Sequence, residues 1–164
     1  MEKFLMLAAV LIMSLVVTPV KAISEPQEKA IVDHCKTIRS SLKDTQRADS
    51  RTRVYLGEYY DEILTNFITP LNMRLVENNL SNADLVENQN KIADTKTLFN
   101  NDFVSYQQDL EELVLMDCVD DPAGFYDKLV KVRQKRKIVE QDTLRMRSLI
   151  STHVKLANQL KGKL

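Results

Sequence analysis

Several residue types that most globular folds rely on are scarce in this chain of 164 residues. It contains no tryptophan, three glycines, four prolines, two cysteines and two histidines. With so few glycines and prolines, the chain lacks the frequent turns of a sheet protein, so its composition predicts an all-helical fold. Lysine and arginine together number 23, as do aspartate and glutamate. The overall charge therefore favours no particular class of partner.

Residues 1–22 have the pattern of an export signal. A charged start precedes an apolar run, and Val20 and Ala22 occupy the small-residue positions before a cleavage site. Cleavage would leave one domain, residues 23–164, in a secreted or extracytoplasmic protein. The alternative is an uncleaved segment that anchors the protein to the membrane. It is disfavoured because the apolar run, which begins at Phe4, is shorter than the roughly 20 residues that a membrane span needs.

The two cysteines organise the expected fold. In an exported chain they are expected to form a disulfide, because oxidising compartments favour that bond. The midpoint between Cys35 and Cys118 falls at the start of a polar stretch, residues 76–84. Two helices that turn back within this stretch would bring the thiols level. We therefore expect a helical hairpin with arms at about 25–77 and 81–118.

Apolar residues at alternating spacings of three and four form a stripe along both arms and along a third segment. This segment, about residues 122–161, begins at a proline preceded by two aspartates, which are residues that favour a helix start. Three arms of similar length predict an elongated, antiparallel, coiled-coil-like three-helix bundle. A dimer of two-helix hairpins is the alternative, because a heptad repeat alone does not fix the oligomeric state. Pro70 is expected to kink the first arm, and Asn100 to lie within a continuous second arm.

Parts of the sequence also resemble a known group of proteins. The segments that carry this resemblance are Arg51–Gly57, Pro70–Asn72, Glu77–Leu80, Lys96–Phe99 and Met116–Cys118. Together they resemble uncharacterised exported helical proteins from candidate-phylum bacteria. The resemblance implies export and a helical structure. It carries over no catalytic or binding residue, because that group has no assigned activity.

No pattern in the sequence predicts catalysis, a cofactor or a metal site. In the expected bundle His34 lies at the open end and His153 near the hairpin tip, roughly 45 to 50 Å apart at helical rise, so they cannot share a site. The motifs C-x-x-C-H, Glu-x-x-His and H-E-x-x-H are absent from the sequence. Aspartates around the end of the second arm are interpreted as helix caps rather than calcium ligands. We therefore expect a non-enzymatic protein without a cofactor.

Two groups of residues are candidates for contact with a partner. Tyrosines outside the apolar stripe are suited to recognition surfaces, because the ring is apolar and the hydroxyl remains hydrated. Tyr59 lies on the stripe and is expected in the core. A row of lysines on one face of the third helix could contact an anionic envelope component, although a solvated face is the simpler interpretation. The candidates are Tyr55, Tyr60, Lys128, Lys131 and Lys135.

Asp49 and Arg136 occupy positions of the apolar stripe where a lone charge would be costly to bury. Antiparallel pairing about the disulfide and about the second turn places both residues level with Val104. We therefore expect them to form a charge-assisted pair in a mid-bundle polar layer, with Thr45 and Thr52 nearby. If the pair is buried, breaking it from one side should cost ~3 to 5 kcal/mol.

These observations favour a binding protein over an enzyme. The leading hypothesis is an exported helical protein that presents long helix faces to another macromolecule, either a protein or a cell-envelope component. Nucleic acid is not expected, because the basic residues have no interleaved aromatic platform. One alternative is a holdase-like extracytoplasmic chaperone, which would require an apolar groove between the arms. An enzyme with an unrecognised site is the least favoured alternative.

Overall fold

The computed structural model describes residues 23–80 and 82–161 of the chain. In these ranges the structure contains helices and turns but no strand, and none of the helices is long and apolar enough to span a membrane. The predicted signal segment lies outside the described residues. The elements are α1 (Glu25–Glu62), the π-helical segment η1 (Ile63–Ile68), α2 (Thr69–Glu77), α3 (Ala83–Leu115) and α4 (Pro122–Lys161).

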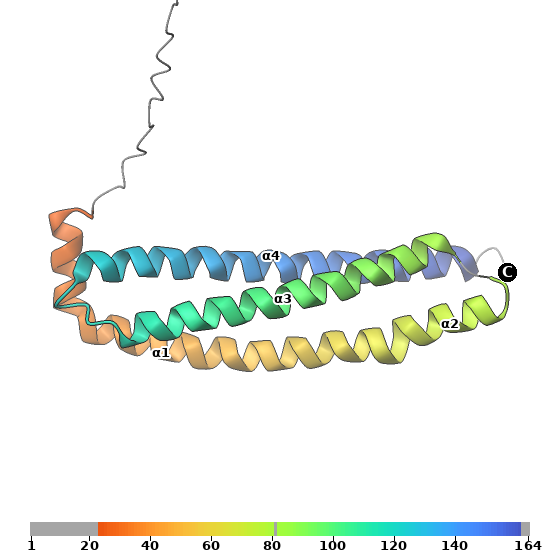
Figure 1. Cartoon of the computed structure of the whole chain (residues 1–164), viewed down its shortest axis with the longest axis horizontal. Coiled ribbons are helices and arrows are strands. Elements are labelled where there is room, and N and C mark those ends of the chain that lie inside the picture. Colours follow the sequence, from red (N-terminus) through yellow and green to blue (C-terminus); the bar gives the residue numbers. More distant parts are fainter. Residues whose placement is uncertain (1–22, 81, 162–164) are drawn as a thin grey trace, which may run out of the picture.

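α1, η1 and α2 form one long arm, α3 returns beside it, and α4 runs back again, so that the three layers make an elongated bundle (Figure 1). The all-helical expectation is confirmed, and α4 has the bounds expected for the third helix. α3 packs against both α4 and the first arm, whereas α1 and α4 have few contacts with each other. α3 is therefore the central helix of the fold.

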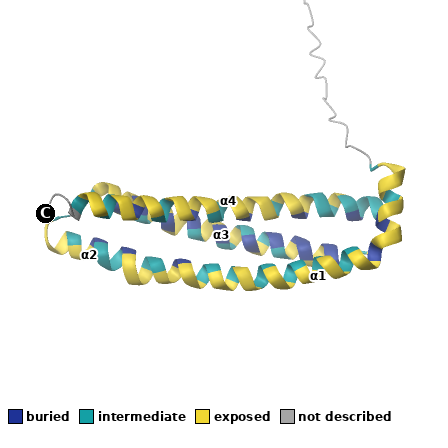
Figure 2. Ribbon diagram, turned by 180° about the vertical axis from the view of Figure 1, so that it is seen from behind, coloured by how far each residue is buried: buried dark blue, intermediate teal, exposed yellow. Residues whose placement is uncertain are grey.

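The buried residues concentrate on α3, as the dark blue segments of Figure 2 show. Three aromatic residues of α3 and one of α1 form a row of edge-to-face contacts, the arrangement that aromatic quadrupoles favour. Tyr60 of α1 meets Phe99 at a centroid distance of 5.6 Å, and Phe103 continues the row to Tyr106. α1 contributes little more to the core, since Tyr60 is one of only three residues that it buries.

The disulfide joins the first arm to the turn between α3 and α4. Cys35 and Cys118 are bonded, with their Cα atoms 5.7 Å apart. α3 ends at Leu115, so Cys118 lies in the turn. The second arm had been expected to extend as far as Cys118. Beside the disulfide, Arg39 donates a hydrogen bond to the carbonyl of Val114 (3.3 Å). The first turns of α1 cross this end of the bundle at a steep angle to the remaining helices (Figures 1 and 2).

The first arm changes its helix type just before its proline. The N–H of Thr69 donates to the carbonyl of Leu64, five residues earlier, which is the π-helical pattern. Proline has no N–H, and its ring crowds the preceding turn. A wider turn that holds one extra residue relieves this crowding. In place of a kink confined to Pro70, the helix changes its geometry over the segment Ile63–Ile68.

At the hairpin tip the chain turns between Glu77 and Ala83. Asn79 adopts a positive φ of 58°, a conformation that asparagine tolerates better than most residues. The side chain of Asn82 accepts a hydrogen bond from the N–H of Asp84 (2.9 Å) and caps α3.

Candidate functional site

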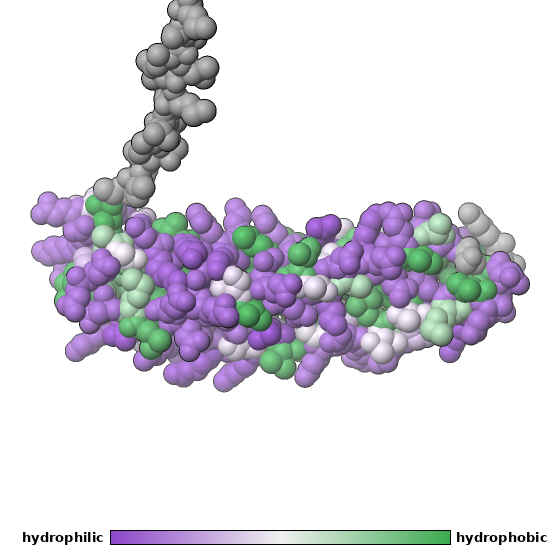
Figure 3. All heavy atoms as spheres, in the orientation of Figure 1, coloured by the Kyte–Doolittle hydropathy of each residue, from purple (hydrophilic) through white to green (hydrophobic). Residues whose placement is uncertain are grey.

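An open groove runs between the first arm and α4 from the middle of the bundle toward the hairpin tip. We call it the interhelix groove, and it exists because α1 and α4 both pack on α3 rather than on each other. On α4 its lining residues recur every three or four positions from Arg136 to Asn158, a length of ~33 Å. The groove contains three cavities of ≈540, ≈400 and ≈310 Å³. Figure 3 shows hydrophobic side chains scattered among hydrophilic ones along one face of the bundle.

The first cavity contains the predicted ion pair. The guanidinium of Arg136 donates to both carboxylate oxygens of Asp49, at 2.9 and 3.0 Å. The expected pairing is present but it is not buried, because the side chain of Arg136 is 59% exposed and that of Asp49 15% exposed. The cost given for breaking a buried pair therefore does not apply. Thr45 and Thr52 do not join the pair, since their hydroxyls donate to carbonyls of their own helix.

Tyr106 is the partner of Asp49 that the sequence analysis missed. Its hydroxyl donates to Oδ2 of Asp49 at 2.6 Å, and the tyrosine itself is buried in the core. Burial and then this hydrogen bond raise the pKa of Tyr106, so the hydroxyl remains a donor. The bond to Asp49 in turn raises the pKa of Arg136. Asp49 thus joins a buried group on α3 to an exposed group on α4.

The second cavity lies against the tyrosines of α1. Tyr55 is 66% exposed, as expected for a contact residue, and its ring stacks on Tyr59 at a centroid distance of 6.4 Å. The predictions for the next two tyrosines were wrong. Tyr59, expected in the core, is 43% exposed, whereas Tyr60, expected at a contact surface, is 1% exposed. Successive residues of a helix point about 100° apart, and it is Tyr60 that faces α3 and meets Phe99.

Arg147 of α4 lines the same cavity and was not predicted as a site residue. It lies close enough to Tyr60 for its charge to lower the pKa of that hydroxyl, although burial has the larger effect and raises the pKa overall. Arg147 has no ion-pair partner among the described residues, and neither does Glu140, which lies two turns away on the same face. The groove therefore offers one positive and one negative group beside exposed aromatic rings.

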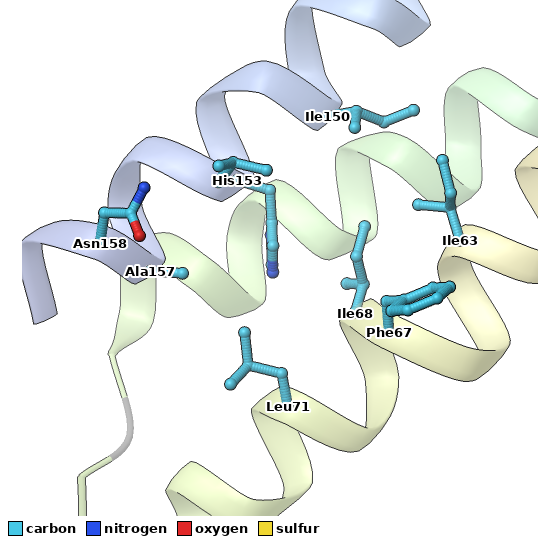
Figure 4. Close-up of a pocket in the computed structure, with 9 residues that line it drawn as sticks. Ile63, Phe67, Ile68, Leu71, Ile150, His153, Ala157 and Asn158 are labelled. Carbon is cyan, nitrogen blue, oxygen red and sulfur yellow. The ribbon is translucent and has the colours of Figure 1, made fainter. Parts of the chain in front are cut away.

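The third cavity, which we call the tip pocket, is almost entirely apolar (Figure 4). The first arm supplies one wall and the last turns of α4 the other. His153 projects from α4 between these walls. It is 3% exposed, and burial lowers its pKa, which favours the neutral ring. The remaining lining residues are Ile63, Phe67, Ile68, Leu71, Ile150, Val154, Ala157 and Asn158.

The predicted row of lysines on α4 is directed at an internal partner. Lys128 and Lys135 form ion pairs with Asp109 of α3, and Lys131 lies 3.5 Å from the same carboxylate. Burial alone would raise the pKa of Asp109, but the ammonium groups of Lys128 and Lys135 outweigh burial and hold that pKa well below its usual range. Of the three lysines only Lys131 is more than half exposed. The expectation that this row contacts a partner loses its support.

Two of the aspartates near the disulfide accept hydrogen bonds from backbone N–H groups, one within the turn and one at the start of α4. Asp117 accepts hydrogen bonds from the N–H groups of Val119 and Asp120, and Asp121 accepts one from Gly124 in the first turn of α4. These bonds lower the pKa of Asp117. Within residues 23–80 and 82–161, no three histidine, cysteine or acidic side chains are grouped closely enough to hold a metal ion.

Comparisons with protein-family models, with curated proteins and with solved structures found no match to this chain. The interpretation of the interhelix groove therefore rests on its own chemistry. It combines apolar surface with a few fixed polar groups, which is the composition of ligand pockets.

Proposed function

We propose that this protein is an exported, non-enzymatic binding protein that holds a helical segment of another protein in the interhelix groove. The observation that carries the proposal is that α1 and α4 separate from each other while both remain packed on α3. The result is a long open surface whose apolar side chains face outward. Binding of an amphipathic helix in such a groove is a recurrent mode of recognition.

The dimensions and pattern of the groove suit a helix. Its length of ~33 Å corresponds to about 22 helical residues. A helix lying there would contact α1 on one side and α4 on the other, which completes a four-helix arrangement. Its apolar residues would recur at spacings of three and four, like the groove residues on α4. The charges of Arg147 and Glu140 would then favour an acidic and a basic residue about two turns apart on the partner.

An extracytoplasmic location is part of the proposal. The disulfide between Cys35 and Cys118 supports it, because such bonds persist in oxidising compartments and are rare in the cytosol. The apolar segment that begins the chain has the composition of an export signal. Together they favour a partner at the cell envelope or outside the cell.

A holdase-like chaperone is the second candidate, and the apolar lining of the groove favours it as well. Phe67 and Val154 expose large apolar side chains at the tip pocket. Exposed apolar surface of this kind marks an interaction site. A holdase would bind many unfolded chains there, whereas the leading proposal requires one partner helix.

A photo-crosslinking residue in the groove tests both candidates. Placed at Val154 in the exported protein, it should give one discrete adduct in intact cells. The matched control is Ile138, which is also exposed but lies about 160° round α4 from the groove. A broad set of adducts from Val154, together with suppressed aggregation of unrelated unfolded proteins, would favour the holdase. Equal adducts from both positions, or none from Val154, would contradict the use of the groove.

A further inference from the structure

The tip pocket contains a buried polar atom that has no partner among the described residues, Nε2 of His153. The other ring nitrogen, Nδ1, lies 3.3 Å from the side-chain oxygen of Asn88 on α3. That oxygen can only accept a hydrogen bond, so Nδ1 carries the proton and Nε2 presents a lone pair. A buried acceptor without a partner costs free energy, which a suitable donor would recover.

This lone pair faces a space whose other lining residues are apolar apart from Asn158. Figure 4 shows the ring of His153 directed away from α4 toward Leu71, with Phe67 and Ile68 on the first arm and Ala157 on its own helix. None of the other residues that line the pocket titrates. A ligand that fits must therefore be apolar over most of its surface and carry one hydrogen-bond donor at its edge.

The volume of the tip pocket narrows the choice of ligand further. An apolar cavity of about 150 Å³ accommodates benzene, and the tip pocket, at ≈310 Å³, has room for a fused pair of rings. The pocket is open on the groove side, so a ring could enter while the chain that carries it remains in the groove. A two-ring system with one N–H at its edge is the side chain of tryptophan, which is also among the most frequent anchors of protein interfaces.

We propose that the tip pocket binds the indole ring of a tryptophan on the partner segment, with the indole N–H donating to Nε2 of His153. The inference rests on the proposed function, because the tryptophan would belong to the partner helix in the groove. The ligand preference of the pocket can nevertheless be tested without that partner. A second copy of this chain cannot supply the ring, because the chain contains no tryptophan.

The absence of tryptophan also provides the assay, since any indole fluorescence in a mixture comes from the added probe. A fixed, low concentration of indole is titrated with the full chain, and the titration is repeated with N-methylindole, which lacks the donor. Indole should bind about fivefold more tightly, the difference that one net hydrogen bond produces. Ala157→Phe, which fills the pocket, should abolish binding of both probes.

Variants at the histidine assign the preference to Nε2. His153→Leu should remove the preference for indole over N-methylindole, so that the two probes bind equally. His153→Gln keeps a polar group near the position of Nε2 and should retain part of that preference. His34→Leu alters the other histidine, at the far end of α1, and should change neither affinity. Equal affinities for the two probes in the unaltered chain, tighter binding of N-methylindole, or no binding of indole would each overturn the inference.

The two proposals can fail separately. If the adduct formed at Val154 identifies a helix without tryptophan, the proposed function stands and the tryptophan anchor is wrong. If indole binds with the expected N–H preference while Val154 gives no adduct, the chemistry of the pocket stands and the proposed function is wrong.

Discussion

Replacement of Asp49 by alanine should destabilise the protein mainly through the tyrosine that it leaves behind. Asp49 accepts hydrogen bonds from Tyr106 and from Arg136, and these two donors differ in their surroundings. Tyr106 is buried, whereas the side chain of Arg136 is more than half exposed. Without the carboxylate, the arginine can return to water, but the tyrosine hydroxyl has no ready substitute.

The structure sets the size of each contribution. A buried hydroxyl that loses its hydrogen bond to a charged group costs about 1.5 to 3 kcal/mol. An ion pair with one exposed partner contributes about 0.2 to 1 kcal/mol. Asp49→Ala should therefore lower the free energy of unfolding by about 2 to 4 kcal/mol, Tyr106→Phe by about 1 to 2, and Arg136→Ala by less than about 1.

Two double-mutant cycles, measured by urea unfolding, test this division. The coupling between Asp49 and Tyr106 should be the larger of the two and should persist in high salt. The coupling between Asp49 and Arg136 should be smaller and should fall as salt screens the exposed charge. If Arg136 has the larger coupling, or if both couplings vanish, the assignment of Tyr106 as the main partner is wrong.

Three further predictions follow from other groups. Reduction of the bond between Cys35 and Cys118 should lower the free energy of unfolding by about 4.5 kcal/mol, less any relief of strain, as chemical unfolding with and without reductant would show. Burial and the neighbouring Asp102 raise the pKa of Asp142, so the ionisation of this carboxyl group opposes folding at neutral pH. Asp142→Asn should therefore raise the melting temperature at pH 7 and have a smaller effect near pH 4. Burial lowers the pKa of His153 from 6.5, so the unfolded chain binds a proton first and stability should fall as the pH drops below about 6.5; His153→Leu should flatten that part of a melting profile against pH.

The architecture could be predicted because it depends on patterns that run along the whole chain. The position of two cysteines about a polar stretch was enough to place the hairpin, and the bounds of α4 followed from a proline and a continuous apolar stripe. The pairing of Asp49 with Arg136 depended on the same register, which a long helix transmits over many turns.

Details that depend on the rotation of one residue could not be predicted with the same accuracy. Tyr59 and Tyr60 exchange their expected places because a shift of one position turns a side chain by about 100°. The lysines of α4 were interpreted without the carboxylate of Asp109, whose burial depends on how closely α3 and α4 pack. The groove could not be foreseen either, since an apolar stripe indicates which residues can pack but not how far two helices separate.

The disulfide also determines what would happen if a protease cut the chain at the hairpin tip. Cys35 and Cys118 close a covalent ring that contains the hairpin from Cys35 onward, with the first turns of α1 and all of α4 attached outside it. A single cut between Glu77 and Ala83 would open this ring without dividing the molecule, because the two pieces would remain joined through sulfur. The first arm would then be held at one end only, beside Arg39 and Val114, and the tip of α2 would lose its covalent link to α3. Such a cut would leave the wall of the interhelix groove that the first arm supplies covalently attached to the rest of the molecule through the disulfide alone.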